Sequence, residues 1–239
     1  MPVGLSALVL VTLSSHDPDD LAHAVRERHL RALRSAGLAP VAVAGSASET
    51  EVEAVLERCD AVYLPGTDYV PNALGEDEAT SRAGAATAGL VWDPWKVRAD
   101  LLALRAAWRR RLPTLGVCGG MQAMAILAGG TLRAADGDAH RSLADDHPVR
   151  LVPGTLAADA FGGATTVVAN SYHRQLVDRP PAGLRVCGRA EADGAVEAIE
   201  APTREHPFWL GVQWHPELLG DDRPFAALAA AGRHLASHP

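Results

Sequence analysis

Short apolar runs alternate with amphipathic stretches along the first half of the chain. Four of these runs have the length and composition of buried strands, namely Leu5–Leu13, Pro40–Ala44, Ala61–Leu64 and Leu112–Val117. Helices are predicted at Asp19–Ser35, at Glu49–Arg58, within Trp92–Arg111 and at Ala123–Leu127. We expect the first helix to be capped near Asp17 and to end at Gly37. Regular alternation of strand and helix predicts a parallel sheet built with right-handed crossovers.

The second half of the chain is richer in strands. Short strands are predicted at Val149–Val152, Thr165–Ala169, Leu184–Gly188, Val196–Ile199 and Trp209–Val212, and a closing helix at Arg223–Ala236. We therefore predict an α/β fold, with a three-layer, doubly wound, mostly parallel sheet of the flavodoxin type and a small additional antiparallel part. Residues 1–239 are expected to form one domain.

Composition narrows the class of protein. The chain has 239 residues, of which 48% are hydrophobic, so it can bury a full core. A net charge of −7, without a basic stripe, argues against nucleic acid or an anionic membrane as partner. The apolar start lacks the basic n-region of a signal peptide, and no run reaches the length that spans a bilayer. Three cysteines are too few for a disulfide framework, and we expect a reducing, cytoplasmic location.

A cysteine follows one of the predicted strands in a pattern typical of a nucleophile elbow. Gly116, Cys118 and Gly120 alternate where the strand must turn sharply into the next helix. Glycines suit this turn because a side chain there would collide with the neighbouring strand or helix. The helix that begins at the sulfur favours the thiolate, and the amide of Gly119 points to where an oxyanion would form.

A histidine follows a second buried strand, Phe208–Gln213. Glu217 lies two residues after His215, and Pro216 between them restricts the backbone. Both strands are expected to end at the same edge of the sheet, which is where open parallel sheets bind ligands. Cys118, His215 and Glu217 therefore offer a nucleophile, a base and a carboxylate that orients the base, which points to acyl transfer through a cysteine.

These motifs resemble the class I glutamine amidotransferase superfamily, and within it the gamma-glutamyl-gamma-aminobutyrate hydrolases. The likeness rests on Gly-Val-Cys-Gly-Gly-Met-Gln at 116–122 and Gly-Val-Gln-Trp-His-Pro-Glu at 211–217. Tyr-Leu-Pro-Gly-Thr at 63–67, Asn-Ser-Tyr-His-Arg-Gln at 170–175 and Asp-Gly-Ala-Val-Glu-Ala at 193–198 favour the hydrolase branch. The order and spacing of these segments match the family over nearly the whole chain.

The resemblance implies an activity and a set of site residues. Cys118, His215 and Glu217 would cleave a gamma-glutamyl amide through a thioester and release glutamate and the free amine. Gly66, Thr67 and Gly119 would hold the oxyanion, and the substrate pocket would include Gln122, Asn170, Ser171, Tyr172 and His173. No cofactor is implied, and the expected partners are the small-molecule substrate and, at most, a second copy of the chain.

The chain departs from the family pattern around the substrate. Gly119 stands where the family usually has arginine, and Gly66-Thr67 where it usually has two glycines. In the helix before the elbow, Lys96-Val97 stands where the family usually has an arginine-aspartate pair, and Asp100 where it usually has a glutamate. The triad is unaffected, so the resemblance supports the chemistry more strongly than the identity of the amine.

Two segments, residues 68–90 and 133–147, show no helical or strand pattern and are expected to be loops that face the site and select the leaving group. The second contains residue types that also ligate metals: Asp136, Asp138, His140, Asp145, Asp146 and His147. Their irregular spacing favours an acidic lid, and no metal site is predicted.

Two other functions remain alternatives. One is a glutaminase subunit that delivers ammonia to a partner synthetase. The other is a catalytically silent binding or scaffolding protein.

Overall fold

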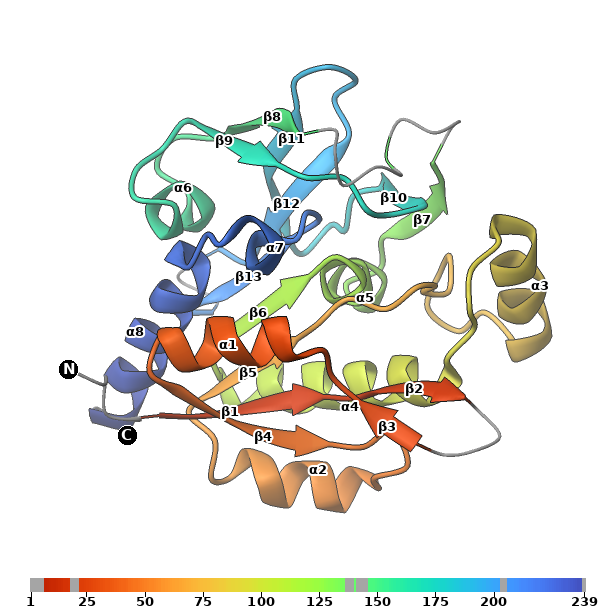
Figure 1. The fold of residues 1–239 in the computed structure, drawn as a ribbon, viewed down its shortest axis with the longest axis horizontal. Helices are drawn as coiled ribbons and strands as arrows, with labels where there is room; N and C mark the ends of the chain where they lie inside the picture. The colour runs from red at the N-terminus through yellow and green to blue at the C-terminus, as the bar shows by residue number, and fades with distance from the viewer. Residues whose placement is uncertain (1–6, 18–21, 136–139, 141–145, 203–205, 238–239) are drawn as a thin grey trace.

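The computed structural model describes residues 7–17, 22–135, 140, 146–202 and 206–237. A nine-stranded sheet forms its centre, in the order β4-β1-β5-β6-β13-β12-β11-β8-β9 (Figure 1). The first five strands in this order are parallel: β4 Leu38–Val43, β1 Ala7–Thr12, β5 Ala61–Leu64, β6 Thr114–Val117 and β13 Trp209–Val212. The remaining strands are antiparallel: β12 Val196–Glu200, β11 Arg185–Ala190, β8 His147–Leu151 and β9 Thr166–Ala169. The predicted α/β fold class is confirmed.

Helices cover both faces of the sheet because the strands are apolar on both sides. Val9 and Val11 pack on one face with residues of α1 (Glu27–Ser35) and α8 (Arg223–Ser237). Leu10, between them, packs on the opposite face with α2 (Glu49–Leu56), α4 (Pro94–Arg110) and α5 (Gly119–Leu127). This is the alternation that a strand with a two-residue period produces. The three layers are visible in Figure 1.

The prediction for the first helix was wrong at its beginning. In place of a helix from Asp19, β2 (Ser14–Asp17) pairs with β3 (Ala22–Ala24), and α1 begins only at Glu27. Its N-cap residue is Arg26, which makes no side-chain capping bond, so the predicted cap position near Asp17 was also wrong. A tertiary contact holds this two-stranded β2–β3 ribbon in place, since the Ser15 amide donates to the buried carboxylate of Asp93 over 2.6 Å. The predicted helix end near Gly37 is confirmed, with φ of 83° at that glycine.

The first predicted loop contains a helix. α3 spans Glu78–Ala88; the Asp77 side chain caps it, and it ends at Gly89, which has a φ of 64°. Both signals are present in the sequence, but the alanine-rich stretch between them has no apolar stripe. The helix projects beyond the sheet at one end of the molecule (Figure 1).

The second predicted loop contains strand residues at both of its ends. It overlaps β7 (Thr131–Ala134), which pairs with β10 (Gln175–Arg179), while Asp136, Asp138 and Asp145 lie outside the described residues. The short helices α6 (Leu156–Ala160) and α7 (Pro216–Leu219) complete the elements. Within the described ranges, no helix combines the length and apolar character needed to cross a bilayer.

Candidate active site

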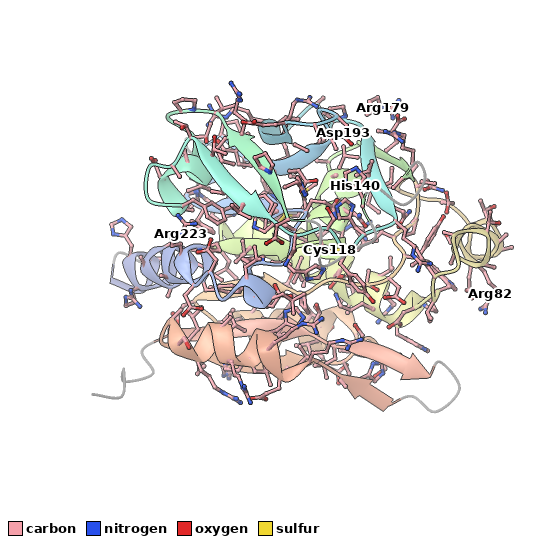
Figure 2. The ribbon with its side chains drawn as sticks, turned by 45° about the horizontal axis from the view of Figure 1, so that its top comes forward. Arg82, Cys118, His140, Arg179, Asp193 and Arg223 are labelled. Carbon is pink, nitrogen blue, oxygen red and sulfur yellow. The ribbon has the colours of Figure 1, made fainter. Side chains whose placement is uncertain are left out.

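Cys118 occupies a strained turn between β6 and α5. Its backbone has φ of 52° and ψ of −110°, a conformation that L-residues rarely adopt. The glycines on either side are required by space: a Cβ on Gly116 would lie 2.7 Å from the Gly120 carbonyl carbon, and one on Gly120 would lie 2.4 Å from the Leu64 oxygen. This is the geometry of a nucleophile elbow, and it places Cys118 near the middle of the molecule (Figure 2).

His215 and Glu217 lie at the same edge of the sheet as Cys118. β13 and β6 are parallel neighbours with Val212 opposite Val117, so both chains leave the sheet together. His215 Nδ1 lies 2.7 Å from Glu217 Oε1, and the Glu217 side chain is fully buried. Because the carboxylate accepts from Nδ1–H, Nε2 is the nitrogen that remains for the thiol.

The charges of these groups are coupled. Burial alone would lower the pKa of His215, but the charge and hydrogen bond of Cys118, together with Glu217, raise it to about 10. Burial opposes ionisation of Glu217 as well, yet the hydrogen bond and charge of His215 lower its pKa below the ordinary value. The arrangement therefore favours a protonated His215 beside an ionised Glu217.

The three residues predicted to hold an oxyanion gather around the cysteine. A Cβ built on Gly66 would lie 3.2 Å from both the Cys118 Cβ and the His215 Cε1. A Cβ on Gly119 would meet the Thr67 backbone nitrogen at 2.6 Å and its Cγ2 at 2.7 Å. The side chain of Thr67 thus occupies space that a residue other than glycine at 119 would need, which links the two departures from the family pattern.

A buried ion pair supports the turn that carries Gly66. Lys96 Nζ donates to the Pro65 carbonyl over 3.2 Å and to Asp100 Oδ1 over 2.6 Å. Thr12 Oγ1 donates to the same carboxylate oxygen over 2.6 Å. At most 1% of the surface of Lys96 and of Asp100 is exposed, so the pair is held in one geometry behind the turn.

The predicted substrate shell divides into two groups. Gln122, Tyr172 and His173 line the pocket with Cys118 and His215. Asn170 and Ser171 are not among the lining residues. The side chain of Asn170 instead holds the backbone of His215, donating to its carbonyl over 3.1 Å and accepting from its amide over 2.8 Å.

Other residues at the site were not predicted from the sequence. Gln213 Nε2 lies 3.7 Å from Cys118 Sγ, and its place two residues before His215 is the signal that was available. Arg28 Nε and His29 Nδ1 each lie 3.6 Å from Glu217 Oε1, and nothing in the amphipathic pattern of their helix marks them. Burial lowers the pKa of His29 to about 4, so its ring is neutral.

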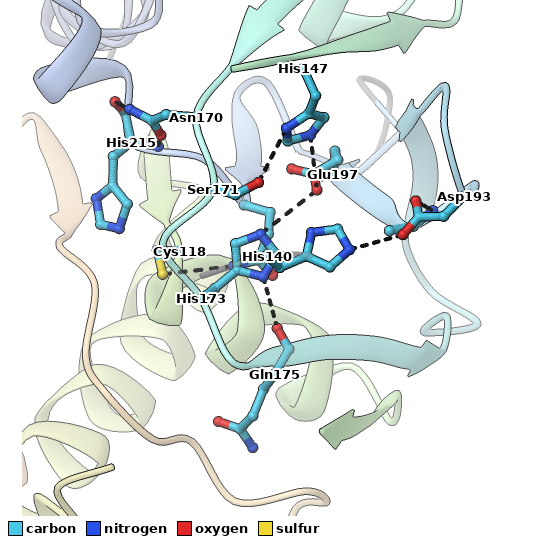
Figure 3. A network of polar contacts seen from close by, with 12 residues as sticks. Cys118, His140, His147, Asn170, Ser171, His173, Gln175, Asp193, Glu197 and His215 are labelled. Atoms are coloured by element: carbon cyan, nitrogen blue, oxygen red, sulfur yellow. Dashed lines mark hydrogen bonds and ion pairs between the residues drawn. The ribbon is translucent and has the colours of Figure 1, made fainter. Parts of the chain in front are cut away.

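The pocket is lined by more basic than acidic side chains. Arg26, Arg28 and Arg174 face it, with Asp68 as the acidic member. This local excess of positive charge contrasts with the overall charge of −7. A second group of buried polar side chains, His140, His173 and Glu197, lies beside the pocket (Figure 3).

The remaining cysteines have a different environment. Cys59 and Cys187 are both buried. Burial, with the neighbouring Asp60, raises the pKa of Cys59 to about 11, and burial raises that of Cys187 well above its ordinary value. Both thiols therefore stay protonated at neutral pH.

Comparison with known proteins gives consistent matches. The family described as Peptidase C26 matches residues 3–217. A gamma-glutamyl-gamma-aminobutyrate hydrolase of Escherichia coli is 29% identical over 210 residues, covering 81% of this chain and 78% of that protein. A putative glutamine amidotransferase of Mycobacterium tuberculosis is 33% identical over 190 residues, covering 75% of this chain and 58% of that protein.

Solved structures share the fold. The glutaminase domain of CTPS from Trypanosoma brucei, with bound acivicin, superposes with a TM-score of 0.67 at 18% identity, covering 96% of this chain and 94% of that one. A protein from Thermoplasma acidophilum described as a putative GMP synthase component gives a TM-score of 0.63 at 18% identity, with 98% and 99% covered.

Proposed function

The chain belongs to the Peptidase C26 family, and from this membership and the site geometry we propose that it is a cysteine-dependent gamma-glutamyl hydrolase. Its substrate is a gamma-glutamyl amine compound, and its products are glutamate and the free amine. The observation that carries the proposal is the 2.7 Å contact between His215 Nδ1 and Glu217 Oε1, next to a cysteine in a strained elbow. The relatives named as hydrolases support the choice of substrate class.

The first half of the reaction forms a thioester. The thiolate of Cys118 attacks the gamma-carbonyl carbon, and the carbonyl electrons move to oxygen. His215, as the imidazolium, gives its proton to the departing amine as the carbon–nitrogen bond breaks. Glu217 holds the imidazole so that Nε2 faces the reacting atoms, and it stabilises the positive charge.

Backbone amides stabilise the negative oxygen of the intermediate. The amide of Gly119 at the start of α5 and an amide of the Gly66–Thr67 turn are the proposed donors, since both segments enclose Cys118. Donors of this kind contribute about 3 kcal/mol each to transition-state stabilisation in hydrolases.

The second half of the reaction regenerates the enzyme. His215, now neutral, removes a proton from water, and the resulting hydroxide attacks the thioester carbon. The carbon–sulfur bond breaks, glutamate leaves, and Cys118 returns to the thiolate. A thiolate cycle of this kind suits a reducing compartment, which is consistent with a cytoplasmic enzyme acting as one domain.

The charge of the pocket indicates the form of the substrate. Arg26, Arg28 and Arg174 favour ligands with carboxylates, of which the glutamyl group itself has one. Gln122 is anchored by the Gln175 carbonyl at 3.0 Å and by Gln213 at 3.2 Å, so it presents a fixed amide to the pocket.

A glutamate-release assay tests the proposal and separates it from the glutaminase alternative. The panel consists of gamma-glutamyl-aminobutyrate, gamma-glutamyl-putrescine, gamma-glutamyl alkylamines and free glutamine, with Cys118→Ala as control. We expect release from a gamma-glutamyl amine and none from the control. Release from glutamine alone would favour a glutaminase that delivers ammonia to a synthetase, and release by Cys118→Ala would exclude the cysteine mechanism.

A further inference from the structure

Three buried side chains with metal-ligating atoms face one another beside the pocket. His140, His173 and Glu197 each place one ligand atom within 4.8 Å of the others. They come from a turn after β7, the segment between β9 and β10, and β12. The two imidazole rings lie with centroids 4.9 Å apart, next to the carboxylate (Figure 3). Hydrolysis at Cys118 does not require any of them as acid, base or nucleophile.

Hydrogen bonds fix the tautomers of both histidines. His140 Nε2 lies 2.8 Å from Asp193 Oδ2, and His173 Nδ1 lies 3.2 Å from the Gln175 carbonyl. Both partners are acceptors, so these nitrogens carry the protons. The lone pairs therefore belong to His140 Nδ1 and His173 Nε2, which are buried and have no hydrogen-bond partner in the described part of the chain. Metal-ligating histidines are oriented in this way by carboxylates and carbonyls behind them.

Glu197 presents a third acceptor to the same space. Its side chain is fully buried, and neither carboxylate oxygen has a hydrogen-bond donor among the described residues. Oε1 lies 3.8 Å from His173 Nε2. Converging acceptor atoms are costly to bury in a protein interior, and a cation would satisfy them together.

His147 completes a set of four. Its Nε2 lies 3.6 Å from Glu197 Oε1, and its Nδ1 lies 3.1 Å from Ser171 Oγ. Its ring is nearly perpendicular to that of His140, with centroids 6.3 Å apart. The four residues thus approach the same space from different sides, and each histidine has a protein group behind it.

We propose that His140, His173 and Glu197, with His147 as the fourth ligand, form a binding site for a divalent transition metal, for which Zn²⁺ is the best match. Zinc takes four nitrogen and oxygen ligands at about 2.0–2.1 Å in tetrahedral geometry, which places ligand atoms roughly 3.3 Å apart. The spacings of 3.6 to 4.8 Å are wider, so binding draws the side chains together.

The proposed metal has a structural role. It joins the turn at His140 and the start of β8 to β12 in the antiparallel half of the sheet. It also fixes the ring of His173, which lines the pocket beside Cys118. The spacing of His140 and His147 alone gave no ligand pattern, because the other two ligands come from later in the sequence. The site does not depend on the proposed hydrolysis.

Metal titration of the full chain tests the proposal. Protein stripped with a chelator is titrated with ZnCl₂ against a chromophoric chelator, and with CoCl₂ while visible absorption is recorded. We expect one equivalent of Zn²⁺ and an intense tetrahedral Co²⁺ spectrum. Asp193→Asn, behind His140, should weaken binding by roughly 10- to 100-fold, and Glu197→Gln or His140→Ala by more.

Two controls separate this site from others. His206→Gln removes a buried imidazole packed against Trp108 and Trp209, and it should leave the affinity unchanged. Cys118→Ala should bind as the unmodified chain does, because the proposed ligands exclude the nucleophile. Loss of binding in Cys118→Ala would place the metal on the catalytic thiolate and overturn the proposal.

Other results would also overturn it. Substoichiometric Zn²⁺ binding, or equal affinity in Glu197→Gln, would show that surface histidines bind the metal. If the Glu197 and His140 variants do not fold, the Co²⁺ spectrum of the unmodified chain tests the proposed ligand set by itself. A weak octahedral spectrum, or a sulfur-to-cobalt charge-transfer band, would contradict the ligand set of nitrogen and oxygen.

Discussion

The substitution Gly119→Ala tests whether the turn after β5 takes part in catalysis. A Cβ at 119 would lie 2.6 Å from the Thr67 nitrogen and 2.9 Å from its oxygen, well inside the 3.4 Å at which ordinary contact begins. The Thr67 nitrogen and oxygen belong to the backbone, so a change of side-chain rotamer cannot relieve these contacts. The Gly66–Thr67 turn, or the start of α5, must therefore move by several tenths of an ångström.

This displacement has two expected costs. Overpacking of this kind lowers the free energy of unfolding by about 1–3 kcal/mol. Loss of one oxyanion donor lowers kcat by about 10²- to 10³-fold. Because the oxyanion exists only in the transition state, KM should change little.

Steady-state kinetics with a gamma-glutamyl amide, combined with urea unfolding, measure both effects. Gly183→Ala is the matched control, since a Cβ there meets no atom within 4 Å. In the double variant Thr67→Gly/Gly119→Ala, only the contact with Cγ2 is relieved, so kcat should stay low. A kcat for Gly119→Ala within a few-fold of the unmodified protein would refute the proposed role of this turn, and full recovery in the double variant would refute the backbone clash.

Three further predictions follow from the same contacts. Asn170→Ala leaves the buried amide of His215 without its acceptor, while the His215 carbonyl still accepts from the Leu218 amide over 3.1 Å, so the free energy of unfolding should fall by about 1–3 kcal/mol. We expect kcat to fall with it, and an unchanged kcat would show that the two Asn170 hydrogen bonds do not position the histidine. Lys96→Met leaves Asp100 charged and buried, which should lower the free energy of unfolding, measured in urea, by about 3–5 kcal/mol. The double variant Lys96→Met/Asp100→Leu should recover most of this stability. If it does not, the loss comes from altered packing and not from the unpaired charge. The value of kcat/KM should fall above about pH 10, where His215 loses its proton. Glu217→Gln should move this fall to lower pH, because the charge of Glu217 raises the pKa of His215. A fall at the same pH in both proteins would contradict the coupling between His215 and Glu217.

Local sequence signals were sufficient for the elements around the nucleophile. β5 at Ala61–Leu64 has the predicted bounds, and the elbow at Cys118 has the strained backbone that its flanking glycines indicate. Both depend on residues adjacent in sequence. The start of α1 failed for the opposite reason, because the Asp93 carboxylate that holds Ser15 in the β2–β3 ribbon lies 78 residues away.

The same distinction applies to the site. His215 and Glu217 are two residues apart, so their contact could be expected from the sequence. Asn170 was assigned to the substrate shell, and no local pattern shows that its side chain turns to the backbone of a residue 45 positions later. Arg28 and His29 approach Glu217 only because α1 packs against α7.

The most direct test of the central proposal is to trap the acyl-enzyme. The protein is mixed with a gamma-glutamyl amide that it hydrolyses, quenched in acid within one turnover, and analysed by mass spectrometry of the intact chain and of its peptides. We expect one added glutamyl group on the peptide that contains Cys118, and none in Cys118→Ala. Glutamate release without this adduct, or an adduct on Cys59 or Cys187, would contradict the proposed nucleophile.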